Sequence, residues 1–149
     1  MNEKLEAILL QIDEVMNEWL SNHGFSAISA GLEDEFGWYN NSDSIAYNFL
    51  VCEHADSIFD NFLYEELGCL YDVGTFWLSW FHELGHSETF HLISDTNWRE
   101  VPTDLIDYLR CPREILASKW AVEYINTHIE DVVELAREVD ELRRQIYSL

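Results

Sequence analysis

The sequence predicts an α+β protein, a mostly helical single domain with a small antiparallel sheet or hairpin and a long C-terminal helix. Apolar residues recur at helical spacing near both ends of the chain. Between positions 25 and 51, short segments rich in aromatic residues show a loose alternation of apolar and polar residues, which is typical of strands. A chain of 149 residues with 48% hydrophobic residues suits one core, and no repeat or linker divides it. We therefore expect one domain over residues 1–149.

The first third of the chain predicts a helix and a hairpin. Leu5, Leu9, Ile12 and Met16 share one helical face, and Gly24 is a stop signal for that helix. Short extended segments are expected at 25–30, 36–39 and 44–51. Because positions 40–43 are all turn formers, segments 37–39 and 45–47 should pair as a hairpin.

Three further helical segments follow. Residues 55–67 form a helical pattern ended by Gly68, and residues 73–93 carry an apolar stripe rich in aromatic side chains. From Pro112 onward nearly every residue is a helix former. Apolar residues at steps of three and four near the C-terminus would pack on the same domain or pair with a second copy as a homodimer: Ile129, Val132, Ala136, Val139 and Ile146.

Charge and composition exclude several classes of function. The chain has 29 acidic and 8 basic residues, a formal net charge of −21, and no Lys or Arg between Lys4 and Arg99. Direct nucleic-acid binding is not expected, because neutralising phosphates needs basic side chains. No apolar run is long enough to span a membrane, and Cys52, Cys69 and Cys111 form no disulfide pattern. We therefore expect a cytoplasmic protein with no membrane partner.

His82, Glu83 and His86 write the pattern H-E-x-x-H inside the helical segment 73–93. Residues four apart lie about 400° round a helix, so the two imidazoles share a face and can bind one ion. Glu83 points elsewhere but can reach a water on the ion's open position. The alternative is a helix that carries its histidines on a solvent-exposed face.

A third ligand would distinguish a metal site from a coincidence. The best candidate is Glu114, early in a new helix and followed by alanines three and seven positions later, which would let this helix approach the histidine helix closely. Glu100 and Asp104 compete with it. His91 lies about 180° round the helix from His82 and cannot join the site if the helix continues.

The sequence H-E-L-G-H followed by E-x-x-A-x-x-x-A resembles the compact gluzincin metallopeptidases, including the ImmA/IrrE-like and phage-encoded minimal proteases. The resemblance implies Zn²⁺ bound by His82, His86 and Glu114, with Glu83 as the catalytic base for peptide-bond hydrolysis. It also implies an edge strand beside the cleft. Members often have Asp or Asn where this chain has Ser118, and Tyr124 or His128 could stabilise the transition state.

The negative charge supports alternatives from other classes. If the protein is an enzyme, its field would favour a basic protein or peptide substrate. An acidic chain, of phage or other mobile-element origin, could also inhibit a DNA-binding protein by imitating nucleic acid, with the metal site structural or vestigial. A third alternative is a regulatory partner that associates through its C-terminal helix.

Overall fold

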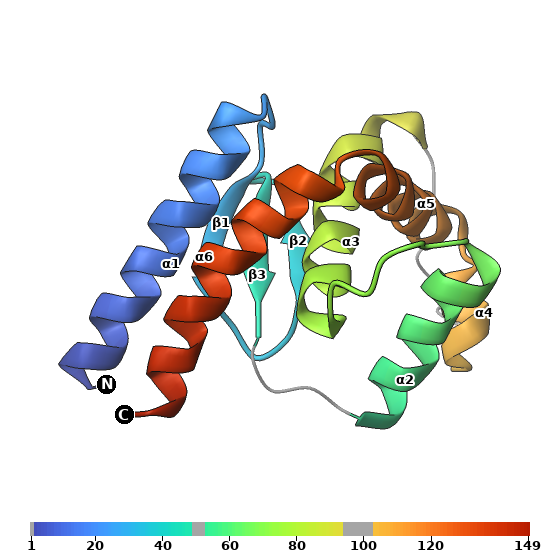
Figure 1. Ribbon diagram of the computed structural model, residues 1–149. Coiled ribbons are helices and arrows are strands. Elements are labelled where there is room, and N and C mark those ends of the chain that lie inside the picture. Colours follow the sequence, from blue (N-terminus) through green and yellow to red (C-terminus); the bar gives the residue numbers. More distant parts are fainter. Residues whose placement is uncertain (1, 49–52, 94–102) are drawn as a thin grey trace.

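Helices make up most of the structure, a computed structural model that describes residues 2–48, 53–93 and 103–149 (Figure 1). A small sheet follows the first helix, and the long last helix lies beside that first helix, which confirms the α+β class. The elements in order are α1 (Glu3–Asn22), β1 (Ile28–Leu32), β2 (Gly37–Tyr39), β3 (Ser44–Tyr47), α2 (Glu53–Asn61), the π-helical turn η1 (Phe62–Glu66), α3 (Thr75–Thr89), the 3₁₀ turn η2 (Phe90–Leu92), α4 (Leu105–Leu109), α5 (Pro112–Thr127) and α6 (Ile129–Tyr147).

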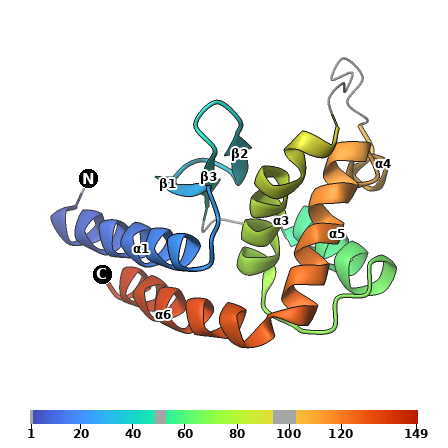
Figure 2. The ribbon, with the colours of Figure 1, turned by 90° about the horizontal axis from the view of Figure 1, so that it is seen from above.

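The first and last helices form a pair that covers the sheet side of the molecule (Figures 1 and 2). The Asn2 side chain caps α1 by accepting hydrogen bonds from Lys4 N and Leu5 N. The Trp19 indole Nε1 donates to the Asp131 carbonyl at 3.2 Å, which joins the end of α1 to the start of α6.

The apolar seam of α6 packs within the domain, as the first of the two alternatives required. Val132 and Val139 are buried in the core, and Ile129, Ala136 and Ile146 pack against it. Pairing of two copies through this helix stays a prediction.

The three strands form a mixed sheet in the order β1-β3-β2. β2 and β3 are the expected antiparallel hairpin, with Trp38 opposite Ile45. β1 pairs with β3 in parallel, so the sheet is not antiparallel throughout. Alternation along a segment predicts which residues share a face, but it does not predict the direction of the neighbouring strand. The edge strand β2 lies beside α3, whereas β1 lies beside α1.

Several helix and strand boundaries in the structure differ from those that the sequence predicts. The segment predicted at 25–30 is a strand at Ile28–Leu32, and the helix predicted at 55–67 ends as a π-helical turn. α3 is shorter than predicted, because it changes to a 3₁₀ turn after Thr89. The C-terminal helical region is broken at His128, where the backbone leaves the helical conformation between α5 and α6.

The aromatic stripe of α3 is the centre of the core. Trp77, Trp80 and Phe81 are fully buried, and Trp19 of α1 packs edge-on against both Trp80 and Phe81. This burial anchors one face of α3 and leaves its other face to the histidines. Cys69 and Cys111 are free thiols, and Cys52 lies outside the described residues.

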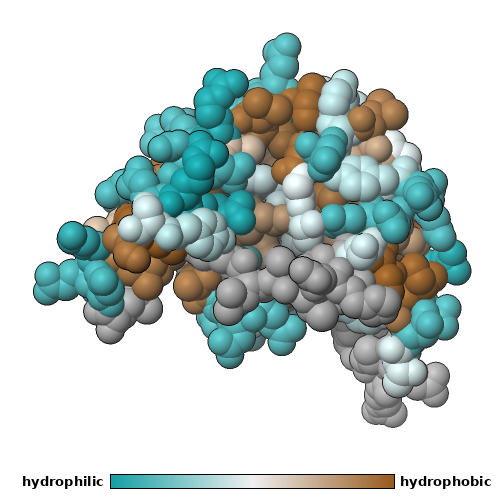
Figure 3. Space-filling view, turned by 60° about the horizontal axis from the view of Figure 1, so that its bottom comes forward, coloured by the Kyte–Doolittle hydropathy of each residue, from teal (hydrophilic) through white to brown (hydrophobic). Residues whose placement is uncertain are grey.

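The surface reflects the composition. Hydrophilic side chains cover much of the face shown in Figure 3, and hydrophobic ones gather in separate patches. Among the described residues, no helix combines the length and apolar character that a membrane crossing needs.

Candidate metal centre

Two histidines and a glutamate from neighbouring helices converge on one point. His82 and His86 lie one turn apart on α3, with ring centroids 4.8 Å apart, and Glu114 reaches them from α5. Glu114 Oε1 lies 3.1 Å from His82 Nε2 and 3.2 Å from His86 Nε2. One ligand atom from each residue falls within 4.8 Å of the others, so this group could hold a metal ion.

These side chains are not on a solvent-exposed face. His82, Glu83 and Glu114 are 5%, 9% and 4% exposed. The ring of Phe59 in α2 packs edge-on against His82 at 5.6 Å, which covers the imidazole from a third helix. The alternative of a helix that merely displays histidines to water is therefore wrong.

Small residues allow α3 and α5 to approach each other, as predicted. Gly85 lies between the two histidines in the sequence, and its backbone meets the backbone of Ala117 with no space for a side chain. Ala117, at this contact, and Ala121, one turn further along α5, are both fully buried. The absence of side chains here lets the Glu114 carboxylate reach the imidazoles.

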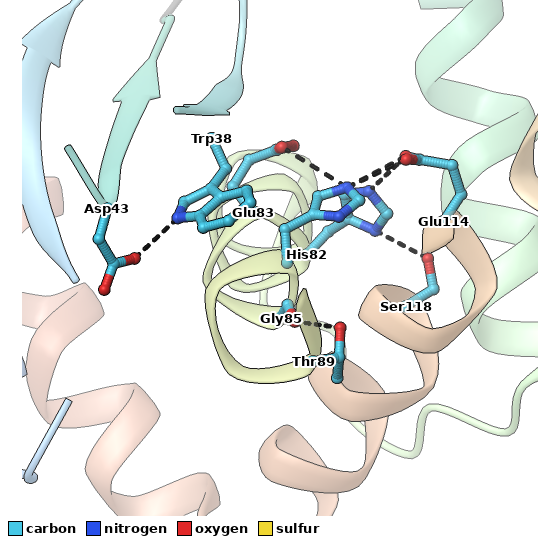
Figure 4. A network of polar contacts seen from close by, with 9 residues as sticks. Trp38, Asp43, His82, Glu83, Gly85, Thr89, Glu114 and Ser118 are labelled. Carbon is cyan, nitrogen blue, oxygen red and sulfur yellow. Dashed lines mark hydrogen bonds and ion pairs between the residues drawn. The ribbon is translucent and has the colours of Figure 1, made fainter. Parts of the chain in front are cut away.

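The His82 ring is oriented from α5. Its Nδ1 lies 2.8 Å from the hydroxyl oxygen of the fully buried Ser118 (Figure 4). When Nε2 is the ligand atom, Nδ1 carries the ring proton and donates a hydrogen bond to Ser118 Oγ. Ser118 therefore provides, with a hydroxyl, the orienting contact that an Asp or Asn would provide.

The electrostatics of the site favour an ionised Glu114 beside the imidazole of His82. Burial opposes ionisation of Glu114, but the hydrogen bonds and the charges of both histidines together hold the pKa of Glu114 well below its usual range. Burial alone would lower the pKa of His82, whereas its hydrogen bond to Glu114 and the charges of Glu83 and Glu114 raise it. The site thus concentrates negative charge around two imidazoles.

Glu83 lies at the same site without joining the ligand group. Its Oε1 is 4.0 Å from His86 Nε2. Burial, opposed by His82 and His86 and reinforced by Glu114, raises the pKa of Glu83. A raised pKa makes the carboxylate of Glu83 a stronger proton acceptor.

The group opens into a cleft of about 440 Å³. Edge strand β2 supplies one wall, α3 supplies Glu83 and His86, and α4 and α5 supply the opposite side. The lining residues are Phe36, Gly37, Trp38, Asn40, Glu83, His86, Phe90, Tyr108, Arg113 and Glu114.

The other candidate ligands are Asp104, Glu100 and His91, and none of them is part of the ligand group among the described residues. Asp104 caps α4, where its Oδ1 accepts from Ile106 N at 3.0 Å and Asp107 N at 3.2 Å, so its carboxylate has another role. Glu100 lies outside the described residues. His91 is exposed in the 3₁₀ turn beyond α3 and is not a member of the group.

Tyr108, which the sequence reasoning missed, lines the cleft in place of Tyr124 and His128. Burial, then the charge and hydrogen bond of Glu114, raise the pKa of Tyr108, so its hydroxyl stays protonated. Tyr124 and His128 instead stack on each other at 4.3 Å beside a separate cavity. Tyr108 comes from a five-residue helix with no motif, and only a tyrosine shortly before Glu114 could have suggested it.

The donor set suits a divalent cation. Ligand atoms about 2.1 Å from a tetrahedral zinc ion lie about 3.4 Å apart, close to the 3.1 and 3.2 Å from Glu114 Oε1 to the two imidazoles. No protein-family model matches the chain, and comparisons with curated proteins and solved structures find no match.

Proposed function

We propose that this protein is a zinc metallopeptidase of the compact gluzincin type. The observation that carries the proposal is the buried convergence of His82, His86 and Glu114, with Glu83 beside them at the cleft. Imidazole and carboxylate ligands on two helices match zinc better than the oxygen-rich sites of magnesium or calcium. When bound, zinc would act as a Lewis acid that polarises a carbonyl and lowers the pKa of water.

Glu83 would be the general base. Its carboxylate takes the proton of the attacking water at Oε1 and returns it to the amine of the leaving fragment. Burial raises the pKa of Glu83, which makes its carboxylate a stronger base than a solvent-exposed one. Tyr108 keeps its proton and would donate a hydrogen bond to the oxygen of the reacting carbonyl.

The substrate would be an extended peptide or protein segment. β2 is an edge strand, and Gly37 and Trp38 of this strand line the cleft. Backbone groups at a sheet edge can bind an extended peptide as an added strand. The acidic composition favours a basic substrate.

Metal content is the first test. Elemental analysis of purified, untagged protein should find about one zinc per chain, and His82→Ala and Glu114→Ala should each lose it. Asp104→Ala is the matched control, because it removes a carboxylate that caps α4 and is not a member of the ligand group. Zinc retained by both ligand variants would contradict the site.

Hydrolysis is the second test. The protein is incubated with a library of peptides from a proteome digest, and new termini are identified by mass spectrometry. Cleavage should stop on adding a chelator and should be absent in Glu83→Gln, which keeps its zinc. Cleavage by Glu83→Gln at the wild-type rate would remove Glu83 from the role of base.

Failure to bind zinc would favour the acidic binding protein. Such a protein would saturate its partner at a fixed ratio and release it as salt increases. A peptidase instead acts at amounts far below its substrate.

A further inference from the structure

A single carboxylate joins the hairpin to the histidine helix. Asp43 lies in the turn between β2 and β3 with a left-handed backbone, at a φ of 46°. Its Oδ1 accepts hydrogen bonds from Trp38 Nε1 at 2.8 Å and from Ser87 Oγ at 2.6 Å. Its Oδ2 accepts from Ser26 Oγ at 2.6 Å. Three segments of the chain therefore meet at one side chain.

The hydrogen bond from Trp38 places its indole beside a metal-ligand candidate. The indole and the His86 imidazole are nearly parallel, with planes 14° apart and centroids 6.3 Å apart. Phe90 packs against the same indole at 5.0 Å. The indole is thus held at its N–H by Asp43 and at its ring by Phe90.

The two histidines are supported from opposite sides. Figure 4 shows Ser118 and Glu114 on one side of His82, and Trp38 and Asp43 on the other. His82 is oriented by a hydrogen bond from α5, whereas the ring that lies nearly parallel to the His86 imidazole comes from the hairpin. A histidine that binds a metal must keep its ring in a fixed orientation to bind tightly. Residues that contact the ring on the side away from the metal usually set that orientation.

We propose that Asp43 and Trp38 are positioning residues of the metal centre. Asp43 holds the Trp38 indole in place, and the indole restricts the rotation of the His86 ring. The hairpin turn thereby raises the affinity for metal although it contributes no ligand atom. This inference rests on the proposed function in one respect, since it takes His86 to be a metal ligand. The simpler role for Asp43 is to fasten the hairpin to α3 through Ser87, with no effect on the metal.

Cobalt binding separates these roles without any enzymatic assay. Co²⁺ is titrated into metal-free protein, and affinity and the visible absorption spectrum are recorded, with folding checked by circular dichroism. Trp38→Ala and Asp43→Ala should weaken Co²⁺ binding by about 10- to 100-fold and alter the spectrum. Trp38→Phe keeps a ring beside His86 and should recover part of the affinity.

Two further variants are controls. Ser87→Ala removes the direct link from Asp43 to α3 but leaves the link to Trp38, so it should keep wild-type affinity. Asp72→Ala removes a carboxylate that accepts from Tyr64 and from Gly74 N at the other end of α3, and it should also bind as wild type. Equal losses in Ser87→Ala and Trp38→Ala, or no loss in Trp38→Ala, would overturn the positioning role. If Asp43→Ala does not fold, Trp38→Phe and Ser87→Ala decide the question.

A metal-free measurement keeps this inference separate from the proposed function. Nuclear Overhauser contacts between the ring protons of Trp38 and His86 should be present in the wild type and lost in Asp43→Ala. If the wild type takes up no metal but shows this pattern, the peptidase proposal fails and the positioning of His86 by Asp43 stands. Contacts that persist in Asp43→Ala would overturn the positioning role whatever the metal content.

Discussion

Replacing Gly85 by alanine should separate α3 from α5 and weaken the metal site. A Cβ at this position would lie 2.3 Å from the carbonyl oxygen of Ala117 and 3.0 Å from its Cα. A carbon–oxygen contact needs about 3.3 Å, so the helices would have to move apart by about 1 Å locally. Both partners are helix backbone, and neither can turn aside as a flexible side chain would.

The size of the effect follows from opposing contributions. Alanine in place of glycine stabilises a helix by about 1 kcal/mol, whereas overpacking a tight contact costs about 3 kcal/mol at the upper end of its range. The expected net loss is about 2 kcal/mol in the free energy of unfolding. Because metal–ligand distances tolerate only about 0.2 Å, a 1 Å shift of Glu114 should lower zinc affinity by about 100-fold or more.

Urea unfolding in chelator and zinc competition against a coloured chelator measure the two effects separately. Gly37→Ala is the matched control, because a Cβ there meets nothing within 4 Å and the backbone is not left-handed. That variant should keep its zinc affinity. A Gly85→Ala protein with wild-type unfolding and wild-type zinc affinity would refute the close contact as the basis of the site.

Three further outcomes are expected. Tyr108→Phe should lower kcat by about 10²- to 10³-fold with zinc content unchanged, as measured on a peptide cleaved by the wild type; equal kcat would exclude its hydrogen bond to the reacting carbonyl. Asp104→Ala should cost about 1 kcal/mol in urea unfolding through loss of the helix cap and leave zinc content unchanged, whereas lost zinc would restore Asp104 as a ligand. Burial tends to raise the pKa of Asp43, but the hydrogen bonds that its carboxylate accepts from Ser26, Ser87 and Trp38 lower that pKa overall. Ionised Asp43 therefore stabilises the fold at pH values above the unfolded pKa of about 3.9. This stabilisation is lost as the pH falls through the lower pKa of the folded state. The stability of Asp43→Asn should therefore decline less between pH 6 and pH 2, and identical acid profiles would contradict this.

The ligand group could be predicted because its information is local. His82 and His86 are one helical turn apart, so the helical pattern alone places them on one face. The alanines after Glu114 indicate a helix face that can approach another helix closely. The parallel pairing of β1 with β3 could not be predicted, because alternation does not encode which strand lies next to which.

The surroundings of the group depend on contacts between distant residues. Ser87 and Asp43 are 44 positions apart, and nothing in either segment indicates that they meet. Tyr108 interacts with Glu114 from a short helix without periodicity, so helical patterning could not place it in the cleft. Ser118 stands where the metallopeptidases that the sequence resembles often have Asp or Asn, and only the folded structure shows that its hydroxyl contacts His82.

A metal ion bound at the candidate site would also stabilise the folded protein. His82 and Glu114 are 32 positions apart, so one bound ion would close a long loop of the chain as a cross-link does. An ion that binds only the folded state at 100 times its dissociation constant adds about 2.7 kcal/mol to stability. If zinc binds as proposed, its removal would then lower the stability of the folded protein as well as stop the proposed reaction.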